Sequence, residues 1–175
     1  MFQDESRFGR INDVKRCWCF LNKRPNVAKQ IIREYVYIYA AFNPITGSCD
    51  MVILPYMTKE TMNCFLEILS QRHPKELILL ICDGASNHKE SALKIPDNII
   101  IEKLPARSPQ LNPSENMWDE IKEKFFYNQI FKSMKSLTNR ICKAILHYEE
   151  NTEIVKSITG WNWIKERINV GLKEN

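Results

Sequence analysis

The segment from Leu104 to Trp118 places the strongest local constraint on the fold, because it holds three of the chain's eight prolines. Proline fixes φ and has no backbone N–H, so these residues favour a stiff loop. The loop should become a helix at Pro113, with Asn112 as the N-cap residue and Glu115 at the third helical position. In a capping box, a glutamate at this position folds back onto the N–H of the cap. Glu115 is therefore either a cap or a carboxylate held rigidly at a helix start.

The chain around this segment predicts a layered α/β domain. A strand over 34–42, a turn and a returning strand over 50–54 form a hairpin. A helix from Thr58 to about Gln71 precedes the continuous apolar run 77–82, which is typical of a buried central strand with both faces covered. This order of strands followed by alternating helices and strands favours a mixed central sheet of about five strands flanked by helices.

Other segments complete the prediction. Strands are expected over 2–5, 17–21 and 98–101, with a polar turn over 7–13. Helices are expected over 86–93, 113–127 and 136–149. Trp161 and Trp163 are expected to pack against the body of the protein and to have no role in a functional site.

The composition excludes several classes of protein. Apolar residues make up 44 % of the 175 residues, which suits a globular chain. No apolar run is long enough to span a membrane, and the first residues do not form a signal peptide. The spacing of the six cysteines matches no zinc or disulfide framework, so we expect reduced thiols. These features favour a cytoplasmic protein.

Positive charge gathers in one segment. Between Arg7 and Arg33 there are eight basic residues and one acidic residue, whereas the rest of the chain holds 17 basic and 20 acidic residues. A basic segment on a near-neutral body indicates a polyanionic partner, with a solvated loop as the alternative. The candidate DNA-binding residues here are Arg7, Arg10, Lys15, Arg16, Lys23 and Arg24.

Three carboxylates lie at positions where they could bind a metal ion. Asp4 lies in the first strand, Asp83 ends the apolar run, and Glu115 opens the helix after the proline loop. Mg²⁺ takes oxygen ligands and keeps several waters, so a few carboxylates at strand ends and a helix start can hold it. Two such ions about 4 Å apart support phosphodiester chemistry. Taken singly, each residue also has a purely structural explanation, as a terminal charge, a turn or a cap.

Three further residues could support such a site. Glu5 follows Asp4, Asn112 precedes Glu115, and His88 lies five residues after Asp83. His88 is either a surface helix residue or a group that orients a phosphate or a metal ligand. The sequence contains neither a G-x-S-x-G motif nor a P-loop.

Three blocks of sequence together resemble a known family. The blocks 2–9, 80–88 and 104–118, the last with the pattern S-P-x-L-N-P-x-E-x-x-W, are similar to the catalytic core of bacterial insertion-sequence transposases of the mariner-like superfamily. The resemblance runs from Met1 to about Ile164. It implies a ribonuclease H-like fold and an Asp-Asp-Glu triad, which falls on Asp4, Asp83 and Glu115.

The resemblance also implies cofactors and partners. Two Mg²⁺ or Mn²⁺ ions would bind the triad, and double-stranded DNA would supply the transposon ends and a target that is usually a TA dinucleotide. A homodimer is implied, because two transposon ends are processed together. The setting would be the bacterial cytoplasm, at the nucleoid.

The chain departs from the family pattern in four ways. Arg107 replaces the usual aromatic residue before Ser-Pro, and Asn87 replaces an aromatic residue often found before the motif histidine. The 31 residues between Asp83 and Glu115 are slightly fewer than usual. The family's N-terminal helix-turn-helix region is absent, so residues 1–175 are expected to form a single catalytic domain.

Two interpretations of the missing region remain open: a separate chain supplies DNA recognition, or the chain is an inactive or regulatory DNA-binding remnant. A metal-dependent nuclease of the same fold, without strand transfer, is the other alternative. Arg107, in the proline loop, joins the candidate DNA-binding residues.

Overall fold

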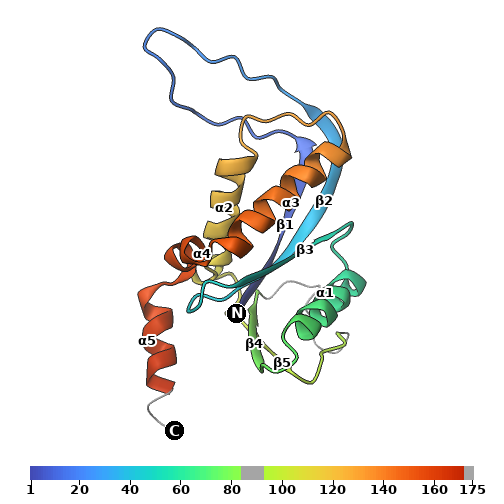
Figure 1. Ribbon diagram of the computed structural model, residues 1–175, viewed down its shortest axis with the longest axis vertical. Helices are drawn as coiled ribbons and strands as arrows, with labels where there is room; N and C mark the ends of the chain where they lie inside the picture. The colour runs from blue at the N-terminus through green and yellow to red at the C-terminus, as the bar shows by residue number, and fades with distance from the viewer. Residues whose placement is uncertain (84–92, 172–175) are drawn as a thin grey trace.

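A five-stranded mixed sheet forms the centre of the molecule, in a computed structural model that describes residues 1–83 and 93–171 (Figure 1). The strands are β1 (Phe2–Ile11), β2 (Ile31–Phe42), β3 (Cys49–Leu54), β4 (Ile78–Cys82) and β5 (Ile99–Lys103). Their order is β3-β2-β1-β4-β5, so β1 is the central strand. β2 runs antiparallel to both β1 and β3, whereas β4 runs parallel to both β1 and β5. The predicted mixed sheet is confirmed.

Helices cover both faces of the sheet (Figure 1). On one face, α1 (Lys59–Arg72) packs its buried residues Phe65 and Leu66 against the β2 residue Tyr39. The other face carries α2 (Ser114–Phe125), α3 (Met134–Glu150) and α4 (Thr152–Thr159), and α5 (Asn162–Gly171) continues beyond α4. No helix in the described part of the chain is both long and apolar enough to cross a bilayer.

The central strand is longer than predicted. β1 runs through Arg7 and Gly9 to Ile11, where the sequence indicated a polar turn. Pairing with β2 along its whole length overrides the weak strand propensity of these polar residues, and a register shift lies between Gly9 and Arg10. The buried side chain of Phe8 continues the alternation that a sheet strand requires.

The strand predicted over 17–21 is wrong. Residues 12–30, here called the basic arm, form a long loop between β1 and β2 that extends away from the body of the molecule (Figure 1). Trp18, Phe20 and Leu21 are 103 %, 82 % and 90 % exposed. An apolar run forms a strand only where a neighbouring strand and a core can receive it, and the arm reaches neither.

The remaining predictions hold in part. The hairpin is confirmed, and Thr58 caps α1 in a capping box with Thr61. β4 is buried on the α1 face but not on both faces, since Leu79 is 48 % exposed. The ring of Trp163 contacts that of Phe2, with centroids 6.5 Å apart, yet Trp163 stays 42 % exposed. All six cysteines are free thiols. The helix predicted over 86–93 lies almost entirely outside the described residues.

Candidate active site

The two aspartates are brought to one level by the pairing of parallel strands. β1 lies beside β4, with Phe2 opposite Ile81. Asp4 lies two residues beyond Phe2 on β1, and Asp83 lies two residues beyond Ile81, just past the end of β4. Continued by two residues, the same parallel register would put the two aspartates at the same level.

Glu115 joins Asp83 in a cavity of about 330 Å³. The walls of this cavity are the proline loop, including Pro105, Arg107 and Pro109, and the start of α2. Arg107 has a φ of 59°, in the left-handed region that non-glycine residues seldom adopt. The loop therefore closes over the end of β4 and positions the first turn of α2 there.

The pKa of the Asp4 carboxyl lies well above its ordinary value. Its residue is 9 % exposed, and burial, followed by the negative charge of Glu115, raises its pKa to about 7. Two hydrogen bonds oppose this shift, from the Glu5 N–H to Oδ1 at 2.9 Å and from the Trp118 indole N–H to Oδ2 at 3.0 Å. A cation beside Asp4 and Glu115 would relieve the repulsion that raises this pKa.

The start of α2 is tied to β1 by side chains. Asn112 Nδ2 donates to the Gln3 carbonyl at 3.4 Å, and Ser114 Oγ donates to the Phe2 carbonyl at 3.3 Å. Both residues are buried. Because these carbonyls belong to the two residues just before Asp4 on β1, the two bonds fix where α2 presents Glu115 relative to Asp4.

The predicted capping box is wrong. α2 begins at Ser114, one residue later than expected, and Asn112 Oδ1 accepts a hydrogen bond from the Ser114 N–H at 3.1 Å. The Asn112 N–H donates to the Pro109 carbonyl at 2.9 Å, in a short 3₁₀ turn, so it cannot receive the Glu115 carboxylate. The Glu115 side chain is exposed to the cavity instead of closing the helix end.

The donor set suits a hard cation. Within the described residues no three Asp, Glu, His or Cys side chains converge closely enough to hold one ion together. Mg²⁺ does not need such a cage, because it binds through one or two carboxylates, substrate phosphates and water. Oxygen atoms of Asp4, Asp83 and Glu115 fit that mode, with Asp83 and Glu115 in one cavity.

The residues predicted to support the site differ in where the structure places them. Asn112 lies two residues before α2, not at its N-cap, and its hydrogen bonds to Gln3 and Ser114 position the helix. Glu5 follows Asp4 on β1, so its side chain points to the opposite sheet face. There burial, and next the charge of Glu5, raise the pKa of the Cys82 thiol. His88 and Asn87 lie outside the described residues.

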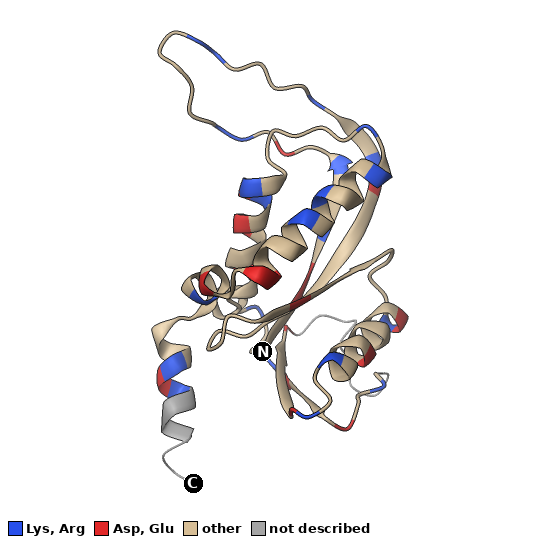
Figure 2. Ribbon diagram, in the orientation of Figure 1, with Lys and Arg blue, Asp and Glu red and all other residues tan. Residues whose placement is uncertain are grey.

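The predicted DNA-binding residues lie in three different places: on the basic arm, on β1 and at the carboxylate cavity. Lys15, Arg16, Lys23 and Arg24 lie exposed on the basic arm, and Figure 2 shows their charge along it. Arg7 lies on β1 with its guanidinium 5.2 Å from the centre of the Tyr35 ring. Arg107 lines the carboxylate cavity.

Arg10 does not present its charge to a ligand. Its side chain is 12 % exposed, pairs with Glu34 at 2.6 Å, and donates to the carbonyls of Phe131 and Lys132 at 2.9 and 2.8 Å. Arg10 therefore fixes the root of the basic arm to the segment before α3. These contacts make Arg10 a weaker candidate for binding DNA than the exposed arm residues, and charge counting does not separate a buried arginine from an exposed one.

Trp118 and Ser114 are the site residues that sequence reasoning missed. Trp118 follows Glu115 by three positions, so both lie on the same side of α2. That spacing is the signal that could have placed an indole N–H near the carboxylates. Ser114 had no such signal, because its partner is a backbone carbonyl on a distant strand.

A family model described as "DDE superfamily endonuclease" matches residues 1–138. The chain belongs to this family of DDE endonucleases. An uncharacterised protein of Sinorhizobium fredii is 37 % identical over 111 residues, which are 63 % of this chain and 82 % of that protein. The predicted membership of the DDE superfamily is confirmed.

Solved structures of the Mos1 transposase share the fold of this DDE endonuclease. The paired-end complex with the left transposon end has a TM-score of 0.59 at 15 % identity, covering 91 % of this chain and 55 % of that one. The mariner paired-end complex with Mn gives 0.58 at 17 %, with the same coverage. The chain thus spans about half the length of the solved proteins it matches.

Proposed function

We propose that this DDE endonuclease is the catalytic domain of a transposase, which cleaves DNA at transposon ends and transfers the cut strand into target DNA. The observation that carries the proposal is the meeting of Asp83 and Glu115 in one cavity, close to Asp4, whose pKa is raised by burial and then by the charge of Glu115. Of the Mos1 structures of the same fold, one is a paired-end complex with the left transposon end and another is a strand transfer complex.

The catalytic roles are proposed for Asp4, Asp83 and Glu115. Together with DNA phosphate oxygens they would hold two Mg²⁺ or Mn²⁺ ions. When bound, these ions would activate an attacking oxygen and stabilise charge on the leaving oxygen. Trp118 and the Glu5 N–H orient the two oxygens of Asp4. Asn112 and Ser114 hold Glu115 at a fixed place relative to β1.

Double-stranded DNA is the proposed substrate and partner. The exposed arm residues, with Arg7 and Arg107, would contact phosphates, which gives affinity that depends on salt but not on sequence. A TA dinucleotide is the proposed target. A separate chain carrying a helix-turn-helix domain would recognise the transposon ends, and the setting would be the bacterial cytoplasm.

A homodimer is also proposed. Two transposon ends have to be cut and joined together, and one chain offers one carboxylate cavity. The tip of the basic arm supports this, since Trp18, Phe20 and Leu21 are almost fully exposed. Apolar side chains grouped in this way are typical of a surface that a partner covers.

Nicking of supercoiled plasmid DNA with Mn²⁺ tests the proposal. The parent chain should nick, and Asp83→Ala should reduce nicking to background. Asp119→Ala, which removes an exposed carboxylate from the same helix as Glu115, is the matched control and should nick like the parent. Equal nicking by the parent and Asp83→Ala would overturn the assignment.

The products separate a transposase from a nuclease of the same fold. With a pre-cut transposon end and target DNA, strand transfer gives joined molecules, whereas a nuclease gives only hydrolysed ones. Binding of DNA without either product would identify an inactive remnant.

A further inference from the structure

A basic groove lies on the α3 side of the molecule, away from the carboxylate cavity. Its volume is about 320 Å³. The polar residues that line it are Gln129, Lys132, Ser136, Asn139, Arg140 and Lys143. None of the residues lining this groove is acidic.

The helical repeat explains why this surface of α3 is basic. Ser136, Arg140 and Lys143 recur at intervals of four and three residues and so share one side of the helix. Leu137 and Ile141 are buried on another side, against the sheet. Acidic residues are absent from α3 until Glu149 and Glu150, at its C-terminal end. Figure 2 shows the positive charge on the half of α3 nearer the arm and the negative charge at the far end.

The cations of the groove have no acidic partner among the described residues. No carboxylate of the described part lies within 4 Å of Lys132, Arg140 or Lys143. Three positive charges gathered without compensation repel one another, so the surface is suited to a polyanion that neutralises them.

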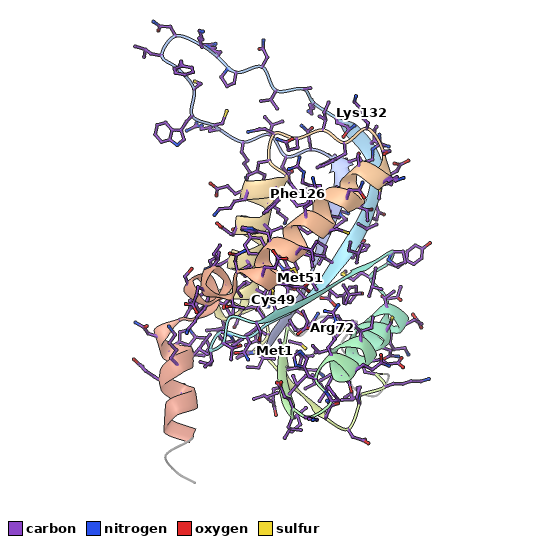
Figure 3. All side chains as sticks on the ribbon, in the orientation of Figure 1. Met1, Cys49, Met51, Arg72, Phe126 and Lys132 are labelled. Carbon is purple, nitrogen blue, oxygen red and sulfur yellow. The ribbon has the colours of Figure 1, made fainter. Side chains whose placement is uncertain are left out.

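The groove is continuous with the root of the basic arm. Arg10 donates to the carbonyls of Phe131 and Lys132, and Gln30 Nε2 donates to the Phe131 carbonyl at 3.0 Å. In return the Phe131 N–H donates to Gln30 Oε1 at 3.0 Å. Lys132 stands beside this junction (Figure 3). The segment that forms one wall of the groove is thus fixed to the arm.

We propose that this groove binds the phosphate backbone of duplex DNA, at a distance from the point of cleavage. The seven residue steps from Ser136 to Lys143 span about 10 Å of helix. Three base steps of one DNA strand also span about 10 Å. The groove can therefore hold consecutive phosphates of one strand. The inference rests on the proposed function, from which the DNA substrate comes.

The length of α2 sets the distance between the two sites. Glu115 lies in the first turn of α2, which has 12 residues, and the groove begins just after the helix ends. Such a helix is about 18 Å long. At 3.4 Å per step, the groove would contact DNA roughly five base pairs from the scissile phosphate.

The test is the salt dependence of duplex binding. The full chain and its variant Lys132→Gln/Arg140→Gln/Lys143→Gln are titrated against a 40-base-pair duplex without divalent metal, over a series of KCl concentrations. Three lost phosphate contacts should reduce the slope of log Kobs against log[KCl] by about 2.7, at about 0.9 per contact. Thermal unfolding of each protein checks that the variant is folded.

Lys59→Gln/Lys75→Gln/Lys94→Gln is the matched control. It removes the same charge from exposed positions on α1 and on loops beside it and before β5, and it should keep the parent slope. An unchanged slope in the groove variant would overturn the proposal. An equal reduction in both variants would also overturn it, because affinity would then follow net charge alone. Nicking does not enter this readout, so failure of the nicking test leaves it interpretable.

Discussion

The indole N–H of Trp118 donates to Oδ2 of Asp4 at 3.0 Å, in a setting where both residues are almost fully buried. This bond joins the helix that carries Glu115 to the strand that carries Asp4. A hydrogen bond to an ionised carboxylate favours the charged form, which is the form that a metal ion requires. Trp118 is therefore a positioning residue for Asp4.

Replacing Trp118 with Phe should weaken metal use while keeping the packing against Phe8 and Phe42. Without the indole N–H, the pKa of Asp4 should rise further above 7, by about one unit for a hydrogen bond of this kind. The rising limb of the pH profile for nicking should move up by that amount, and half-maximal activity should need more Mn²⁺. Trp161→Phe is the control. If Trp118→Phe and the parent had the same pH profile for nicking, Trp118 would not be a positioning residue for Asp4.

Asp4 should make the folded protein less stable as the pH rises. Its pKa is 3.8 before folding and about 7 after it, so the folded state binds the extra proton between these values. The free energy of unfolding should therefore fall as the pH rises through this window, by up to about 4 kcal/mol from this residue alone. Urea unfolding of the parent and Asp4→Asn measures the effect.

The two proteins should be similar in stability below pH 4 and should diverge above it, with Asp4→Asn the more stable at pH 8. Mg²⁺ at pH 8 should stabilise the parent and leave Asp4→Asn largely unchanged. If the difference in stability stayed constant with pH, Asp4 would not be the group that titrates.

Arg10 should matter for the arm rather than for DNA affinity. Replacing Arg10 with Lys removes the fork that bonds two carbonyls and Glu34, and should cost about 2 kcal/mol, within the range for hydrogen bonds to charged groups. Trypsin should then cut within residues 12–30 faster than in the parent. Arg16→Lys, on the exposed arm, is the control and should not change that rate. If trypsin cut Arg10→Lys at the same rate as the parent, Arg10 would not be the residue that fixes the basic arm.

The sequence predicted those elements whose pattern is local. The hairpin of β2 and β3, the capped helix α1 and the strand β4 follow from strand propensity, capping residues and an apolar run. The length of β1 could not be read in this way. Polar residues from Arg7 onward belong to the strand only because β2 pairs with them. The sequence of one segment does not show which other segment it will pair with.

In the candidate site, too, the residues marked by a local pattern could be predicted, whereas contacts between distant segments could not. The proline loop and the strand end indicated Asp83 and Glu115, which line one cavity, and their catalytic role stays a prediction. The capping box failed, because the N–H of Asn112 bonds Pro109 within the loop. The structural role of Arg10 could not be predicted, because the carbonyls that it bonds lie about 120 residues away in sequence.

The central claim is that Asp4, Asp83 and Glu115 hold divalent metal ions together. Electron paramagnetic resonance of Mn²⁺ titrated into the complex of the chain with duplex DNA counts these ions directly. The account predicts two bound ions per chain for the parent and at most one for each of Asp4→Asn, Asp83→Asn and Glu115→Gln, with Asp119→Asn matching the parent. Three site variants that bind as many ions as the parent would contradict it.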